Sequence, residues 1–287
     1  MPEVELSAGV IDYQDTGGAG ETVVLLHGLG FDDSVWSEVV AGLRGQFRVV
    51  VPVLPIGSHR RPMHPEADLS AHGMAALVAE FLERLDLRDV TLVQNDAGTA
   101  QLLVGERDER VARLVLTSCE ALENYPPGFQ GRTLHRAARV PGGLFWLLQS
   151  FRVPFLARMP NSLGGMANRR IPHDLVLRWY RPALTDRGIR RDLAKFCLGG
   201  RPDTYLRAAD RFPTFDRPVL VAWGADDRMM PPATGRRLAE LLPNGRYVEI
   251  PNARTLVPWD NPEALVAEVR RFVAENPLAG GPARGRD

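Results

Sequence analysis

Short apolar runs alternate with amphipathic segments along most of the chain. The run TVVLLHG (residues 22–28) is continuous rather than alternating, which is typical of a strand buried on both faces of a parallel sheet. Two short strand candidates, VEL and GVIDYQD, precede it. Further strand candidates follow, with amphipathic segments and short connections between them: FRVVVPVLP, DVTLVQN, VARLVLTS, RPVLVAWG and RYVEI. This order predicts an α/β fold with a mostly parallel central sheet flanked by helices.

The alternation stops after Glu120 and resumes with RPVLVAWG. The segment between them contains helical stretches and no convincing strand: GRTLHRAARV, GGLFWLLQSF, DLVLRWYRPAL and IRRDLAKFCLGG. An all-helical block inside an α/β sheet predicts a lid or cap. The predicted organisation is a core at 1–121, a helical cap at 122–204, the rest of the core at 205–275 and a flexible tail at 276–287.

Charge and composition exclude several classes of partner. The chain has 35 basic and 35 acidic residues, and no one-signed block is long enough to indicate a nucleic-acid or anionic-membrane surface. The N-terminus lacks the basic and apolar regions of a signal peptide, and no apolar run approaches the length of a spanning helix. We therefore expect a cytoplasmic protein, monomeric or homodimeric, that binds neither nucleic acid nor membrane.

Sequence motifs for metals and nucleotides are missing. There is no paired His or Cys spacing, and neither GxxxxGK[ST] nor GxGxxG after a strand occurs. The two cysteines, Cys119 and Cys197, are expected as buried thiols. The insert is rich in Leu, Phe, Trp and Met, which favours an apolar, lid-covered pocket. We expect a small organic substrate, no metal and no cofactor.

Three candidate sites lie where buried strands end, at residues 27–30 (HGLG), 94–98 (QNDAG) and 223–231 (WGADDRMMP). In open α/β sheets, ligands bind at the C-terminal ends of the strands. Residues 94–98 form a sharp turn from a strand into a predicted helix, GTAQLLVGERDE, at 98–109. We expect these three segments to surround one site.

Together with the terminal loop IPNARTLVP, these motifs resemble the α/β-hydrolase superfamily over roughly residues 5–275. The resemblance implies that Asp96 occupies the nucleophile elbow. A carboxylate there is similar to the haloalkane-dehalogenase and epoxide-hydrolase branch, in which it attacks carbon and forms an ester that water cleaves. The resemblance further implies an oxyanion hole from the Leu29 and Ala97 N–H groups, Asp227 as the orienting acid, and Glu120 as the alternative acid.

The sequence departs from this branch in ways that bear on the substrate. Dehalogenases carry a tryptophan and an asparagine, which hold the halide, where this chain has Ala97 and Leu29. Epoxide hydrolases protonate the opening oxygen with cap tyrosines, and Tyr125 and Tyr180 lie in that region. Six residues are candidate substrate contacts, from the strand ends or the cap: His27, Gln94, Asn95, Tyr125, Trp146 and Tyr180.

The largest departure is Thr255, which stands where the family has its catalytic histidine. A hydroxyl cannot replace imidazole as a base near neutral pH. Without an imidazolium nearby, burial is expected to raise the pKa of Asp96, and Arg254 is a candidate to neutralise Asp227. The histidines elsewhere in the chain are weaker candidates for a substitute base: His27, His59, His64, His72, His135 and His173. The last two lie in the insert.

Three functions stay open at this point. The first is hydrolysis of an epoxide, ester or halide, with Asp96 as nucleophile and an unorthodox base. The second is cofactor-independent, non-hydrolytic acid/base chemistry at Asp96, as in a cyclase, lyase or isomerase. The third is a catalytically silent member that binds a small apolar ligand. The fold does not decide among them.

Overall fold

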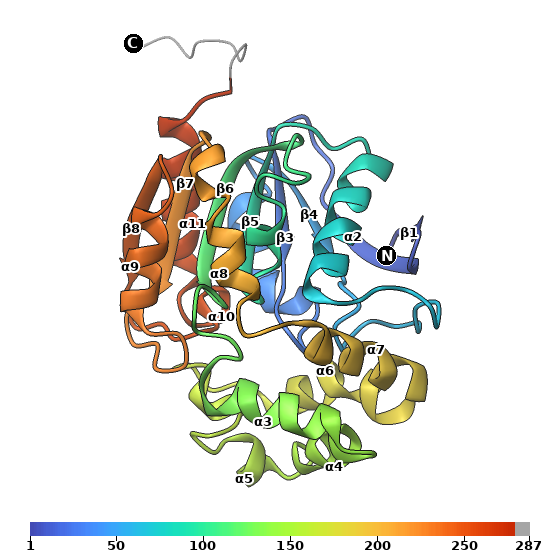
Figure 1. Ribbon diagram of the computed structural model, residues 1–287. Helices are drawn as coiled ribbons and strands as arrows, with labels where there is room; N and C mark the ends of the chain where they lie inside the picture. Colours follow the sequence, from blue (N-terminus) through green and yellow to red (C-terminus); the bar gives the residue numbers. More distant parts are fainter. Residues whose placement is uncertain (279–287) are drawn as a thin grey trace.

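The computed structural model describes residues 1–278, in which an eight-stranded sheet is covered by helices on both faces (Figure 1). The strand order is β1-β2-β4-β3-β5-β6-β7-β8. β1 and β2 pair antiparallel, as do β2 and β4, and the remaining pairs are parallel. The predicted α/β fold with a mostly parallel sheet is confirmed.

Each predicted strand is present, and the central strands bury continuous apolar runs. The bounds are β1 Glu3–Leu6, β2 Gly9–Asp15, β3 Thr22–Leu26, β4 Arg48–Pro52, β5 Val90–Asp96, β6 Val111–Cys119, β7 Val219–Gly224 and β8 Gly245–Ile250. Every residue of β5 and β7 is buried, whereas most of β8, at the sheet edge, is partly exposed. Burial on both faces explains why β5 and β7 lack a polar face.

Helices pack on both sides of the sheet. In Figure 1, α2, α8 and α9 lie in front of it and α11 lies behind, where α11 packs against α1. The core helices are α1 Ser37–Leu43, α2 Ala71–Arg84, α8 Thr204–Ala209, α9 Pro232–Glu240, α10 Val257–Asp260 and α11 Pro262–Glu275, with the short 3₁₀ turns η1 Asp33–Trp36, η2 Thr99–Leu102 and η4 Phe212–Thr214.

The helix predicted at 98–109 is wrong. The structure has only η2 there, followed by turns. Gly105 adopts a left-handed φ of 70°, which ends helical geometry after two short turns. The apolar residues that suggested a helix are buried all the same, because the turns pack against α2 and α8.

The helical insert lies between β6 and β7 and forms the lower part of the molecule in Figure 1. It contains α3 Gly128–Arg139, α4 Gly143–Ser150, α5 Pro154–Ala157, η3 Leu163–Gly165, α6 His173–Thr185 and α7 Arg187–Gly199. α8, which follows, packs against η2 and so joins the core. The division into core and cap at 122 and 204 stays a prediction.

No helix among residues 1–278 is long and apolar enough to cross a membrane. Most of the predicted tail, residues 279–287, lies outside the described part of the chain.

Candidate functional site

Asp96 is the last residue of β5 and lies at a sharp turn with a left-handed φ of 65°. Its backbone oxygen accepts a hydrogen bond from Glu120 N at 2.8 Å, which ties the turn to the end of β6. Non-glycine residues rarely adopt this conformation, and such strain concentrates at functional sites. The turn lifts the Asp96 side chain over the end of the sheet.

The loop after β3 holds one oxygen of this carboxyl group. Leu29 N donates a hydrogen bond to Asp96 Oδ2 at 2.9 Å. The neighbouring Gly28 lets the two approach, because a Cβ there would lie 2.2 Å from Asp96 Oδ2. Ala97 N, the other expected oxyanion donor, instead donates to Asn95 O at 2.9 Å. Among residues 1–278, Leu29 N is therefore the one backbone N–H that donates to this carboxyl group.

A cavity of about 380 Å³ lies between this turn and the cap, and Asp96, Glu120, Tyr180 and His135 are among its lining residues. Most of the lining is apolar and comes from the cap: Phe129, Leu134, Leu147, Leu148, Phe151, Leu156, Met159, Leu163, Met166 and Leu193. A mostly apolar cavity with a few converging polar groups is the usual form of a small-molecule site.

Burial dominates the electrostatics of Asp96. Loss of hydration raises its pKa to about 7, the Leu29 hydrogen bond opposes the rise, and the nearby charge of Asp227 adds to it. Near neutral pH, Asp96 therefore exchanges readily between its two protonation states. That property suits a group that takes part in proton transfer.

Glu120 is a second buried carboxyl group on the same cavity. Its pKa is raised to about 8, first by desolvation and then by the charge of Asp96. Tyr205 Oη donates a hydrogen bond to Glu120 Oε2 at 2.9 Å, which partly offsets the rise. Asp96 and Glu120 are thus two buried carboxyl groups on one cavity, each with a pKa raised toward the range in which a group exchanges protons near neutral pH.

Asp227 is held by the loop after β7 and by Thr255. Its Oδ1 accepts hydrogen bonds from Met229 N and Met230 N, both at 2.9 Å, and from Thr255 Oγ1 at 3.0 Å. Burial raises its pKa to about 6, and these donors, with the nearby Ser118 hydroxyl, oppose the rise. Thr255 is fully buried and donates a hydrogen bond to this carboxylate.

The expectation that Arg254 neutralises Asp227 is wrong. Arg254 Nη1 donates to Gly164 O at 3.3 Å, in the cap, and its backbone N donates to Asp260. Within residues 1–278, Asp227 makes no ion pair. The hydroxyl and N–H donors around this carboxylate replace a counter-charge.

Tyr125 and His135 form one polar pair beside the cavity. His135 Nε2 lies 3.0 Å from Tyr125 Oη, and His135 Nδ1 lies 2.9 Å from Gly131 O. Desolvation lowers the pKa of His135 and raises that of Tyr125. A neutral imidazole that donates a hydrogen bond to Gly131 O through Nδ1 accepts one from the Tyr125 hydroxyl at Nε2. Both ring nitrogens of His135 therefore have hydrogen-bond partners. Tyr180 lies on the cavity beside Gly30.

Three expected substrate contacts support the site instead of lining it. Gln94 Oε1 accepts from Ala100 N, which braces the turn after Asp96. Asn95 Nδ2 donates to Thr255 O at 2.7 Å and so joins the two loops. His27 Nε2 accepts from Leu54 N, and desolvation lowers its pKa to about 4. All three side chains are fully buried and absent from the cavity wall, because the strand ends point them into the core.

Trp146 is an expected contact that does not reach the site. Its side chain is 72% exposed and does not line the cavity. Helix α4 directs Leu144 and Leu148 inward, and Trp146, two residues from each, therefore faces outward.

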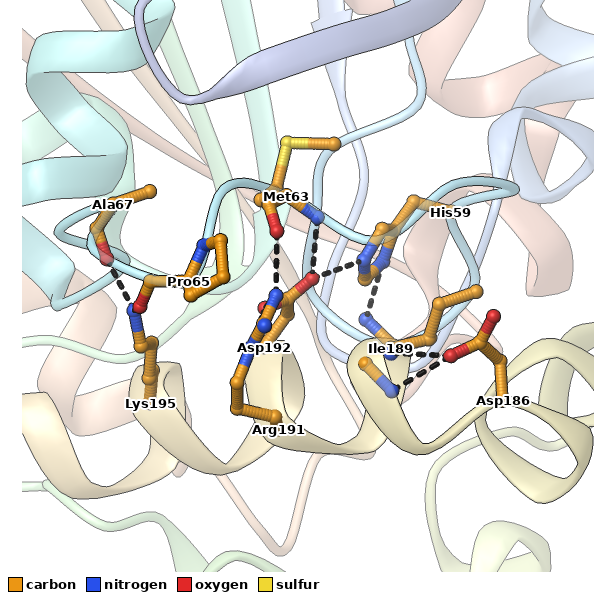
Figure 2. Close-up of polar contacts among 11 residues, drawn as sticks. His59, Met63, Pro65, Ala67, Asp186, Ile189, Arg191, Asp192 and Lys195 are labelled. Carbon is orange, nitrogen blue, oxygen red and sulfur yellow. Dashed lines mark hydrogen bonds and ion pairs between the residues drawn. The ribbon is translucent and has the colours of Figure 1, made fainter.

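The remaining histidines make other contacts. His59 Nε2 lies 3.2 Å from Asp192 Oδ2, and Asp192 also accepts from Met63 N (Figure 2). This buried network fastens the loop after β4 to α7. His173 lies 3.0 Å from Phe151 O in the cap, and His64 and His72 are exposed. Of the six histidines, His135 alone lines the cavity.

Sequence reasoning missed Tyr205 and Met229. Tyr205 reaches Glu120 from α8, and Met229 lines the cavity from the Asp227 loop. Met229 lies within a segment already singled out, whereas no spacing in the sequence connects Tyr205 to Glu120. Within residues 1–278 no group of three or more His, Cys, Asp or Glu side chains is placed to hold a metal ion.

Comparison with known proteins gives one consistent result. The family model described as alpha/beta hydrolase fold matches residues 21–262. Haloalkane dehalogenase 2 of Mycobacterium tuberculosis is 28% identical over 273 residues, covering 92% of this chain and 91% of that protein.

Two solved structures share the fold. A putative ancestral haloalkane dehalogenase has a TM-score of 0.74 at 20% identity and covers 96% of this chain and 99% of that one. A thermophilic esterase from Thermogutta terrifontis has a TM-score of 0.70 at 22% identity, with the same coverage. The chain belongs to the α/β-hydrolase family and is an enzyme of the hydrolase type.

Proposed function

We propose that this enzyme hydrolyses a small, largely apolar epoxide, with Asp96 as the nucleophile and Glu120 as its proton partner. One observation carries the proposal: the two carboxyl groups line the same apolar cavity. Burial raises the pKa of both groups, to about 7 for Asp96 and about 8 for Glu120, so each can gain or lose a proton near neutral pH. In the proposed reaction, Asp96 starts ionised and Glu120 starts protonated.

In the first step, the free oxygen of Asp96 attacks a ring carbon. The ring C–O bond breaks, and Glu120 gives its proton to the ring oxygen. The product is a hydroxyalkyl ester on Asp96 and a carboxylate on Glu120. Leu29 N, already bonded to Asp96 Oδ2, holds the oxygen that does not attack.

In the second step, water attacks Cγ of the ester while Glu120 takes one of its protons. Negative charge develops on Oδ2, and the Leu29 N–H group is placed to stabilise it. Collapse of this intermediate expels the diol, whose oxygen takes the second water proton. Asp96 returns as a carboxylate and Glu120 is again protonated. Glu120 thus replaces the missing histidine as base, and Thr255 fixes Asp227 in place.

An epoxide suits this site better than a haloalkane. Opening an epoxide needs a proton donor, which Glu120 supplies, whereas a halide leaves as an anion that needs N–H donors. The backbone N–H groups near Asp96 are occupied, with Leu29 N on Oδ2 and Ala97 N on Asn95 O. The name of the M. tuberculosis relative makes haloalkanes the first alternative to test.

A second function, acid/base chemistry without hydrolysis, is favoured by Thr255. The histidine position of the family is filled by a buried hydroxyl that donates to Asp227, and Asp96 has a pKa suited to proton transfer at neutral pH. Such an enzyme would form no ester and would add no oxygen from water to its product.

Intact-protein mass tests the proposal. We expect rapid quenching of wild type with a panel of epoxides to reveal a transient adduct on Asp96 and the Asp96→Asn variant to show none. Glu120→Gln removes both the acid and the base, so we expect turnover to fall by about 100-fold or more, with an adduct that forms slowly and persists. Glu123→Gln, an exposed neighbour that pairs with Arg237, is the matched control.

Each variant tests one part of the mechanism. Diol formation by Asp96→Asn at the wild-type rate would show that Asp96 is not the nucleophile. Wild-type turnover by the Glu120→Gln variant would show that Glu120 is neither the acid nor the base, and would leave the role of Asp96 unaffected. Halide release from a bromoalkane, with no reaction of any epoxide, would replace the substrate class.

A further inference from the structure

The cap carries an unusual concentration of positive charge. Residues 124–173 contain no Asp or Glu and seven arginines: Arg132, Arg136, Arg139, Arg152, Arg158, Arg169 and Arg170. All seven are exposed. Arg169 pairs with Glu38, and among the described residues the other six make no ion pair. The chain as a whole has a formal charge of zero, so its positive and negative charges are unevenly distributed and this segment is strongly positive.

Helix α3 directs much of this charge outward. Phe129, Arg132, Arg136 and Arg139 follow one another at intervals of three, four and three residues, which places them on one face of the helix. All four are exposed, whereas His135 is buried and Leu134 lines the cavity. The helix thus has an inner face toward the site and an outer face of three arginines, with the exposed Phe129 at its N-terminal end.

Exposed apolar side chains are interspersed with these arginines along the chain. Seven of the eleven exposed large hydrophobic residues in the described chain fall between 129 and 159: Phe129, Val140, Trp146, Val153, Phe155, Leu156 and Met159. Trp146 and Phe155 are each 72% exposed. In Figure 1, α5, which carries Phe155, lies at the edge of the molecule opposite the sheet. Such a concentration marks a surface that binds something apolar.

The same surface contains the opening of the cavity. Phe129, Leu156 and Met159 are exposed and also line the cavity. Gln130 Nε2 donates to Pro160 O at 3.0 Å and so connects α3 to the segment after α5. The apolar wall of the site therefore continues onto the outer surface between these two elements.

We propose that this surface binds an anionic lipid membrane, with the opening of the cavity toward the bilayer. We call it the cap face and define it by its arginines Arg132, Arg136, Arg139, Arg152 and Arg158 and its apolar residues Phe129, Val140, Trp146, Val153, Phe155, Leu156 and Met159. Aromatic and aliphatic side chains that enter the interface, beside arginines that meet anionic headgroups, are the two components of interfacial binding.

Other occupants fit the cap face less well. A second copy would bring two like-charged surfaces together, which is unfavourable. Nucleic acid matches the arginines but not aliphatic side chains such as Val153 and Leu156, because single strands stack on aromatic rings. The proposal departs from the expectation of no membrane partner. That expectation rested on the lack of a continuous basic block, whereas these arginines are spread over residues 132–170 and the helices of this segment lie at one end of the molecule (Figure 1).

Binding to the membrane does not depend on the proposed function. One consequence does rest on it: an apolar substrate dissolved in the bilayer would enter the cavity directly. Activity toward a water-dissolved epoxide tests the hydrolase by itself, so the two proposals can fail separately.

Sedimentation with vesicles tests the proposal. We expect the full-length protein to bind phosphatidylcholine vesicles that contain phosphatidylglycerol, to bind pure phosphatidylcholine much more weakly, and to be released by salt. Arg136→Gln should weaken binding about fivefold, whereas Arg44→Gln, an exposed arginine on the core side, should change it less than about twofold. Phe155→Ser should weaken binding, and Leu241→Ser, an exposed leucine after α9, should not.

Three results would overturn the proposal. They are equal or no binding to the two kinds of vesicle, preferential binding of single-stranded RNA over anionic vesicles, and self-association by light scattering that Phe155→Ser abolishes while vesicle binding is unchanged.

Discussion

Burial raises the pKa of the carboxyl groups in this site, and within residues 1–278 no cationic side chain forms an ion pair with them. Asp96, Glu120 and Asp227 are buried near one another, and each has a pKa above the ordinary value of its group. A catalytic imidazolium would hold such carboxylates ionised. Thr255 contributes only a hydrogen bond to Asp227. Because its hydroxyl carries no positive charge, it does not hold the carboxyl groups ionised as an imidazolium would.

The pH profile tests the pairing at this scale. We expect the rate to rise as Asp96 ionises near pH 7 and to fall as Glu120 ionises near pH 8. Tyr205 Oη stabilises ionised Glu120, so Tyr205→Phe should raise the pKa of Glu120 and move the falling limb to higher pH, with little change in the rising limb.

Tyr247→Phe is the matched control, because that hydroxyl donates to Glu249 at the edge of the sheet. A falling limb that moves to lower pH in Tyr205→Phe, or moves equally in the control, would contradict the assignment to Glu120.

At the scale of elements, two loops meet at the end of β5. Gly28 is the point of closest approach, because a Cβ there would lie 2.2 Å from Asp96 Oδ2. We expect Gly28→Ala to displace the carboxyl group and to lower kcat by about 100-fold. Gly45→Ala, where a Cβ would meet nothing within 4 Å, should leave kcat unchanged. A Gly28→Ala enzyme with wild-type kcat would show that this approach does not position Asp96.

The sequence predicts the sheet better than the parts that cover it. β5 and β7 are found because a strand buried on both faces needs a continuous apolar run, and the polar turns at their ends locate Asp96 and Asp227. The helix predicted at 98–109 fails because burial by tertiary packing needs no helical hydrogen bonds. Tyr205 was missed because no spacing in the sequence relates α8 to Glu120. Trp146 was misjudged because α4 (GLFWLLQS) is apolar on most of its sides, so the sequence does not show which side faces the core.

For the molecule as a whole, the buried carboxyl groups should cost stability at high pH. A raised pKa means that the folded state holds the proton more tightly than the unfolded state. The favourable contribution of Asp96 is therefore full below its unfolded pKa, near 4, and is lost as pH rises through about 7. Asp96→Asn should thus raise the free energy of unfolding at pH 8.5 by ~2–4 kcal/mol and change it little at pH 4.

Denaturant unfolding at the two pH values measures this difference. Asp210→Asn, at an exposed aspartate after α8, should have no comparable effect. A destabilised Asp96→Asn protein at pH 8.5 would mean that the site stabilises the charged carboxylate.

The most direct test of the central claim is a single turnover in ¹⁸O-labelled water, with enzyme in excess over an epoxide that it hydrolyses. If Asp96 is the nucleophile, water attacks Cγ, so peptide mass spectrometry should find the label in Asp96 and the diol should be unlabelled. Label in the diol and none in Asp96 would show that water attacks the substrate directly, and the nucleophilic role of Asp96 would be wrong.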